Sequence, residues 1–146
     1  MRQFSKHYFT RITSAVFIFL FAYTAINKMA DVPGFIFSIG RHPLFSSYAK
    51  LIAWSVIILE FVSVIFLFHP SFRLYGFFLT STLMLAFTVY IGTMLWLSDN
   101  LPCSCGGVLK ELSWSSHFYL NIFLSGLSLA GLVVEIRARR QLHRLG

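Results

Sequence analysis

Four long apolar stretches dominate the pattern of this sequence. Three of them, residues 12–27, 74–98 and 112–134, contain no charged residue, and the fourth, residues 51–72, contains only Glu60. A helix needs about 20 mostly apolar residues to cross the hydrocarbon core of a bilayer. The pattern therefore predicts four transmembrane helices, at residues 9–30, 47–68, 73–97 and 115–136.

The connections between these stretches are short, which predicts that neighbouring helices run antiparallel. The expected fold is all-α: an integral membrane four-helix bundle with up-down-up-down topology, forming one domain over residues 1–146. Gly126, Ala130 and Gly131 give the last helix small residues for close packing. The first stretch has the basic start and apolar core of a signal peptide, but no small-x-small cleavage site follows it, so we expect it to remain as a span.

The composition agrees with lipid as the surrounding solvent. The chain is 57% hydrophobic and 12% charged, whereas a soluble domain carries about 25% charged residues. A net charge of +7 would suit nucleic acid, but the basic residues lie at the chain ends and in the connections. This distribution is typical of membrane topology signals, so the lipid bilayer is the expected partner and nucleic acid is not.

The 12 lysines and arginines are divided unevenly between the two ends of the predicted bundle. Four lie at one end, at Lys28, Arg41, Lys50 and Lys110, and the other eight lie in the two tails and at Arg73. Cytoplasmic segments carry the excess of basic residues. The division predicts cytoplasmic N and C termini, outward connections at about 31–46 and 98–114, and a multi-pass protein of a bacterial inner membrane.

Both cysteines of the chain lie in the second outward connection, in Leu101-Pro102-Cys103-Ser104-Cys105-Gly106-Gly107. The proline and glycines predict an irregular turn, and the periplasmic side permits disulfides. A disulfide across one intervening residue would be strained and reactive, and it would constrain the unfolded chain little. The pair therefore favours a redox-active dithiol. A copper or zinc site that includes His117 and two incidental cysteines remain as alternatives.

Polar residues form a stripe along the last predicted helix. His117, Asn121, Ser125 and Ser128 follow one another at helical spacing, so we expect them to face the bundle interior. His117 lies in the first turn, twelve residues after Cys105. It is a candidate to accept a proton from a cysteine thiol. The alternative is an interfacial histidine that only hydrates the helix end.

Glu60 lies near the middle of the second predicted span, where a charged carboxylate is costly. Its candidate partners are Lys28 and Asn27, near the outer end of the first helix. Two interpretations are open. Glu60 either makes a helix–helix contact, or it lines a polar pocket beneath the cysteines. In such a pocket it would carry protons or bind a quinone head group, together with Lys28 and Asn121.

These features together resemble the MauE proteins of methylamine utilisation, within the DoxX-like group of small four-helix membrane proteins. The resemblance rests on Asn27-Lys28, Glu60, the Cys-Ser-Cys-Gly-Gly turn and the Leu-Ser-Trp motif with His117 and Asn121. It implies disulfide formation or electron delivery for periplasmic proteins. Ser104 and Gly106 depart from the glycine and aromatic residue of many members. The layout is also similar to that of vitamin K epoxide reductase.

The sequence thus predicts thiol–disulfide exchange at Cys103 and Cys105. No second cysteine pair exists to relay electrons across the membrane, so a quinone or a periplasmic thioredoxin-like protein must be the redox partner. Two other classes stay open: a non-catalytic subunit or assembly factor of a larger membrane complex, and a copper-handling protein. Met29, Met84 and Met94 are not clustered with the cysteines, which counts against copper.

Overall fold

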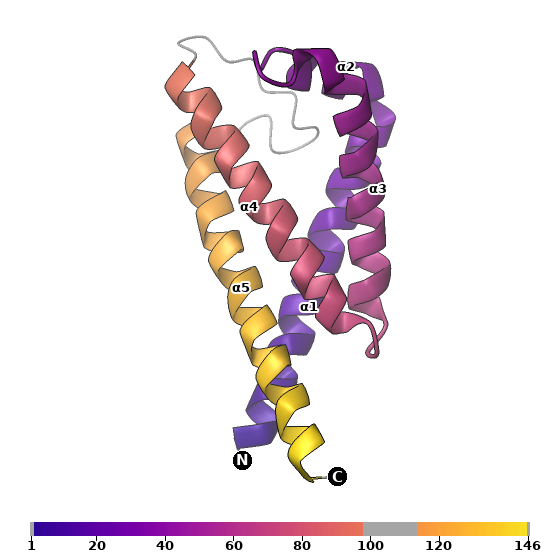
Figure 1. Cartoon of the computed structure of the whole chain (residues 1–146), viewed down its shortest axis with the longest axis vertical. Helices are drawn as coiled ribbons and strands as arrows, with labels where there is room; N and C mark the ends of the chain where they lie inside the picture. Colours follow the sequence, from indigo (N-terminus) through magenta and orange to yellow (C-terminus); the bar gives the residue numbers. More distant parts are fainter. Residues whose placement is uncertain (1, 98–113, 146) are drawn as a thin grey trace.

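The computed structural model describes residues 2–97 and 114–145, and all its regular elements there are helical. In chain order they are α1 (Arg2–Ala30), α2 (Val32–Gly40), the short 3-10 helix η1 (Ser46–Tyr48), α3 (Ala49–Phe68), α4 (Arg73–Leu97) and α5 (Trp114–Leu145). The long helices α1, α3, α4 and α5 run up, down, up and down (Figure 1). The predicted all-α bundle is confirmed.

Four helices are long and apolar enough to cross a membrane. The candidate spans are Tyr8–Ala30, Ser46–Phe68, Arg73–Trp96 and Ser115–Gln141. Their outward surfaces carry large apolar side chains; Phe19 on α1 and Phe68 on α3, for example, are each 77% exposed. Such a surface is unfavourable in water and suits acyl chains. The chain is therefore a multi-pass membrane protein.

The two chain ends and the connection from α3 to α4 lie at one end of the bundle, which we call the turn end (Figure 1). Both expected tails continue the helices, because α1 begins at Arg2 and α5 extends to Leu145. Arg139 of α5 forms an ion pair with Glu135 at 3.3 Å. Its Nη2 also donates hydrogen bonds to the carbonyls of Pro70 and Ser71, at 3.2 and 2.9 Å. These contacts anchor α5 to the turn.

The opposite end is covered by α2, in a segment that we predicted to be a connection. Asp31 caps α2, because its Oδ1 accepts a hydrogen bond from the Gly34 N–H at 3.0 Å. A Cβ at Gly34 would lie 2.2 Å from Asp31 Oδ2, so a larger residue there would displace the capping carboxylate. Phe35 and Ile39 of α2 then pack on the apolar face of α3, against Ala49, Ala53 and Ile57. We call this the capped end.

Glycines permit two close contacts between the long helices. Where α3 and α4 meet, a Cβ at Gly76 would lie 2.8 Å from the backbone nitrogen of Leu67. Between α4 and α5, a Cβ at Gly131 would lie 2.5 Å from Phe77 Cε1. The predicted small-residue packing of α5 is thus confirmed at Gly131. It is wrong at Gly126 and Ala130, which are exposed. A Cβ at Gly126 would meet nothing within 4 Å.

The contrast between these two glycines of α5 gives a matched test of the packing. Gly131→Ala pushes a methyl group into the buried ring of Phe77, and we expect a loss of about 1–3 kcal/mol in the free energy of unfolding. Gly126→Ala should be neutral, or stabilising through helix propensity by up to about 1 kcal/mol. Thermal unfolding of the purified proteins in detergent measures both. Equal midpoints would contradict the observed packing of α4 on α5.

Candidate functional site

A cavity of about 590 Å³ lies among the helices in the half of the bundle nearer the capped end. All five α-helices contribute to its lining, over residues 20–28 of α1, 35–39 of α2, 52–60 of α3, 84–93 of α4 and 117–124 of α5. This volume is within the range of about 300–1,000 Å³ that is typical of small-molecule sites. Most of the lining is apolar, and the polar groups are few and buried. Lys28, Glu60, His117 and Asn121, all predicted site residues, line it together.

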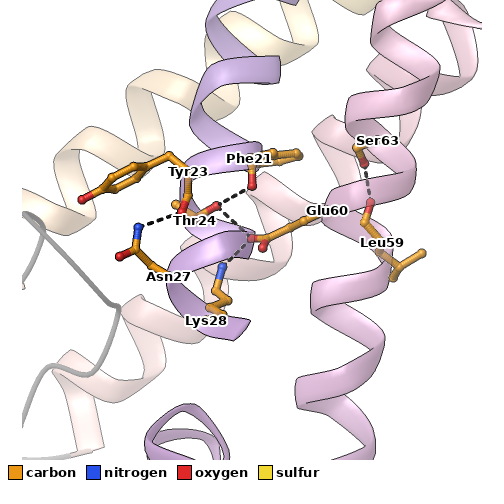
Figure 2. A network of polar contacts seen from close by, with 8 residues as sticks. All are labelled: Phe21, Tyr23, Thr24, Asn27, Lys28, Leu59, Glu60 and Ser63. Carbon is orange, nitrogen blue, oxygen red and sulfur yellow. Dashed lines mark hydrogen bonds and ion pairs between the residues drawn. The ribbon is translucent and has the colours of Figure 1, made fainter. Parts of the chain in front are cut away.

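An ion pair between Lys28 and Glu60 joins α1 to α3 at the wall of this cavity. Both side chains are buried, with Glu60 at 0% and Lys28 at 8% exposure. Thr24 Oγ1, one turn before Lys28, also donates to Glu60 Oε1, at 3.3 Å. Figure 2 shows both side chains reaching from α1 toward the carboxylate. The second carboxylate oxygen, Oε2, has no hydrogen-bond partner among the described residues.

The two partners expected for Glu60 thus behave differently. Lys28 forms the predicted pair, and its ammonium group also lies over the rings of Phe87 and Phe35, 5.0 and 5.4 Å from their centroids. Asn27 lies on another side of α1, where its Nδ2 donates to the carbonyl of Tyr23 at 2.8 Å (Figure 2). Adjacent residues of a helix are about 100° apart, so both cannot face α3.

The polar stripe of α5 faces the bundle interior, as predicted. His117, Asn121, Ser125 and Ser128 are 4%, 8%, 5% and 0% exposed. Asn121 Nδ2 donates to the His117 carbonyl at 3.0 Å, and the hydroxyls of Ser125 and Thr88 lie 3.0 Å apart between α5 and α4. The ring nitrogens of His117 differ from the rest of the stripe, because neither has a hydrogen-bond partner among the described residues.

A second histidine, which the sequence analysis missed, lines the same cavity. His42 follows α2 and is 1% exposed. Its Nδ1 accepts a hydrogen bond from the Leu44 N–H at 3.3 Å, so the ring proton is on Nε2, which donates to Thr93 Oγ1 at 3.2 Å. Both nitrogens are thereby satisfied. His42 connects the capped end to α4, and its only sequence signal was a histidine between Arg41 and Pro43 in an outward segment.

Cys103 and Cys105 lie outside the described residues, in the segment that joins α4 to α5. The two helix ends that flank this segment, Leu97 and Trp114, are at the capped end (Figure 1). Within residues 2–97 and 114–145, no group of three or more histidine, cysteine, aspartate or glutamate side chains is arranged to hold a metal ion. The polar groups that line the described cavity are an ion pair, two imidazoles and a few hydroxyl and amide groups.

Comparison with protein families gives one match, to the family described as Methylamine utilisation protein MauE, over residues 6–134. This range includes the first three candidate spans and the fourth span as far as residue 134. The chain belongs to the MauE family. In the comparisons with curated proteins and with solved structures, nothing matches it.

Membership of the MauE family confirms the resemblance deduced from the residues. The matched range contains the Lys28–Glu60 pair, both cysteines and the buried stripe of α5. The protein is thus a membrane protein of a family associated with methylamine utilisation, and its cavity is enclosed by the matched part of the chain. The roles of the individual site residues remain predictions.

Removal of one member of the ion pair tests what the pair contributes. Lys28→Met leaves the Glu60 carboxylate buried without its cation, and we expect the free energy of unfolding to fall by about 3–5 kcal/mol. Lys28→Met with Glu60→Leu removes both charges and should restore most of that loss. Lys50→Met, at an exposed lysine, is the control. Thermal or denaturant unfolding in detergent measures the stability of all three variants. If the double variant is less stable than Lys28→Met, the two buried charges do not compensate each other.

Proposed function

We propose that this MauE-family protein carries out or supports thiol–disulfide exchange on periplasmic proteins through Cys103 and Cys105. The observation that carries the proposal is His117: a buried imidazole without a hydrogen-bond partner among the described residues, in the first turn of the helix that follows the cysteine segment. A histidine whose nitrogens are not engaged is available to exchange protons. Its place at the end of that segment suits a base for one of the two thiols.

The exchange conserves electrons and protons between two cysteine pairs. His117 takes the proton of one thiol, and the thiolate attacks a sulfur of the partner's disulfide to form a mixed disulfide. The second thiol of the Cys103/Cys105 pair then displaces the partner, which leaves with two thiols while the pair becomes a disulfide. The reverse sequence oxidises a partner dithiol. The relative reduction potentials of the two pairs set the direction.

The cavity is the proposed site for a quinone that regenerates the pair, and the residues present fit such a molecule. Glu60 Oε2 is a buried acceptor without a partner among the described residues, Lys28 carries N–H donors, and Asn121 lies in the same lining. Lys28 and Asn121 would donate hydrogen bonds to the ring oxygens, Glu60 Oε2 would accept one from a hydroxyl of the reduced ring, and apolar side chains would surround the ring. A quinone supplies a two-electron, two-proton couple. A periplasmic thioredoxin-like protein is the proposed alternative redox partner.

The proposed orientation places the turn end in the cytoplasm and the capped end in the periplasm of a bacterial inner membrane. Eight basic residues lie at the turn end. Seven of them lie in α1 and α5, outside the apolar parts of these helices, and the eighth, Arg73, begins α4. Lys28, Arg41 and Lys50 lie toward the capped end. The excess at the turn end supports its cytoplasmic location, and the cysteine segment then faces the oxidising compartment.

Thiol labelling tests this orientation. After mild reduction, a membrane-impermeant maleimide added to intact spheroplasts should label Cys103 or Cys105, because both lie in the segment assigned to the periplasm. A variant with both cysteines replaced by serine is the control for background labelling. Labelling that requires lysis of the spheroplasts would show the opposite orientation, and the periplasmic exchange proposed here would then be excluded.

Replacement of single cysteines tests the exchange itself. In either Cys103→Ser or Cys105→Ser, no second thiol remains to resolve the intermediate, so the variant that keeps the attacking cysteine should trap a mixed disulfide. The trapped species should appear as a larger band on non-reducing gels and disappear with reductant. Cys105 is the expected attacking residue, since the backbone N–H groups of the following glycines favour a thiolate.

The other function classes give different results in the same experiment. A copper or zinc site would lose its metal in both variants, would depend on His117 and would trap no partner. A non-catalytic subunit of a membrane complex would keep full activity when both cysteines are replaced by serine. Either result would exclude the redox proposal.

A further inference from the structure

A layer of buried apolar side chains crosses the bundle on the turn-end side of the cavity. We call it the apolar layer, and its buried members pack in one cluster: Phe17 and Phe21 of α1, Leu67 of α3, and Phe77, Leu83 and Met84 of α4. None of them is more than 6% exposed. The fourth long helix, α5, packs against this cluster with three partly buried leucines, Leu124, Leu127 and Leu132.

The apolar layer forms the floor of the cavity. Leu67 lies beyond residue 60 of α3 and Phe77 lies before residue 84 of α4, which are the positions where the cavity lining stops toward the turn end. Layer and lining meet at Phe21 and Met84, which belong to both. From Phe77 to Met84 the layer is about 10 Å deep, because a helix rises 1.5 Å per residue.

The rings of the apolar layer are closely packed. Phe17 and Phe21 lie edge to face, with 6.1 Å between their centroids. The ring of Phe77 is fully buried and occupies the space beside Gly131, where even a Cβ would lie 2.5 Å from it. Spaces lined only by hydrocarbon stay dry. Because a proton needs water or polar groups to carry it, such a layer is a barrier to protons.

Hydroxyl groups lie beside the apolar layer, but the described residues form no hydrogen-bonded chain through it. Ser63 and Ser128 donate to backbone carbonyls of their own helices, at 2.7 and 2.8 Å. Ser14, Thr80 and Ser81 are buried, and their hydroxyls have no hydrogen-bond partner among the described residues. These three groups could bind water if the rings beside them were absent.

Charged residues are also missing from the depth of the apolar layer. On the cavity side of the layer, Lys28 and Glu60 form the buried ion pair. The next charged side chains toward the turn end are Arg11 of α1, Arg73 of α4 and Glu135 of α5. No aspartate, glutamate, lysine, arginine or histidine occurs in residues 12–27, 61–68, 74–97 or 118–134. No charged side chain is thus available to relay a proton from the turn end to the cavity.

We propose that the apolar layer insulates the cavity from the compartment at the turn end, so that groups in the cavity exchange protons only with the compartment at the capped end. Lipid surrounds the bundle on its other sides and supplies no protons. Glu60 and the ring nitrogens of His117 therefore equilibrate with one side of the membrane.

The consequence for electron transfer rests on the proposed function, whereas the position of the layer does not. Oxidation of the Cys103 and Cys105 thiols to a disulfide releases two electrons and two protons, and a quinone in the cavity takes up two of each. With the layer in place, the protons come from the same side of the membrane as the electrons. The exchange then moves no net charge across the membrane.

Proton flux through the reconstituted full chain tests the insulation without a quinone or a thiol partner. In phosphatidylcholine–phosphatidylglycerol vesicles, a potassium gradient with valinomycin drives protons inward, and an enclosed pH-sensitive dye reports them. Wild-type vesicles should acidify no faster than protein-free ones. Phe17→Ser with Phe77→Ser replaces two rings by hydroxyls near Ser14, Thr80 and Ser81. Water can then enter the layer, and the proton flux should rise by about tenfold or more.

Phe19→Ser with Phe78→Ser is the matched control. These phenylalanines lie on the same two helices, next to Phe17 and Phe77, but they are 77% and 63% exposed. The proton flux of this control should stay at the wild-type level. Each variant is first checked for a cooperative thermal unfolding transition in detergent. The single variants Phe17→Ser and Phe77→Ser are measured as well, so that the test stands if the double variant does not fold, and each should show a smaller rise.

Three results would overturn the inference. Proton flux through the wild type would show that the layer is no barrier. An unchanged flux in the folded serine variants of the layer would place the barrier elsewhere, as in a cavity that is closed at the capped end. An equal rise in the layer variants and in the control would show only a loosened bundle. None of these results bears on the cysteine pair, because trapping of a mixed disulfide tests the proposed function separately.

Discussion

A carboxylate inside a membrane bundle has no bulk water to solvate it, so it depends on the cation and hydrogen-bond donors that neighbouring helices bring to it. Glu60 is in this position, and Lys28 and Thr24 of α1 meet it. The contact fixes the depth and rotation of α1 against α3, because a shift of one turn would separate the charges. Asp31 caps α2 three residues after Lys28. The placement of α2 across the capped end, and with it the roof of the cavity, therefore follows from the ion pair.

The cavity forms because two helix pairs, α1 with α3 and α4 with α5, meet more closely at the turn end than at the capped end. The ion pair and α2 hold α1 on α3, while Gly131 against Phe77 and the contact of Ser125 with Thr88 hold α5 on α4. At the turn end the pairs meet closely, through Gly76 and the bonds of Arg139. Toward the capped end α2 bridges them and the long helices enclose the cavity. Among the buried polar atoms without partners in the described residues, Glu60 Oε2 and both ring nitrogens of His117 belong to residues that line this cavity.

Much of the fold was predictable because a membrane gives a long, charge-free stretch few alternatives to a spanning helix. The buried stripe from His117 to Ser128 was predictable for the same reason, since polar side chains on a spanning helix avoid lipid. The helix α2 was missed although Asp31, with proline two residues later, is a helix-start signal. The segment 31–46 was expected to be a connection only. The burial of His42 was not predictable, because it depends on the placement of Thr93 from a helix about fifty residues later in the chain. The arrangement of the cysteines remains a prediction.

The position of Lys28 also has a consequence for biosynthesis. Its ammonium group is separated from Glu60 by 32 residues, so α1 reaches the membrane before α3, which carries its counter-ion. A cation near the end of a lone helix extends toward the lipid head groups. It can move inward only when α3 arrives with the carboxylate and neutralises it. The final depth of α1 therefore depends on its pairing with α3, whose Glu60 carries the counter-charge.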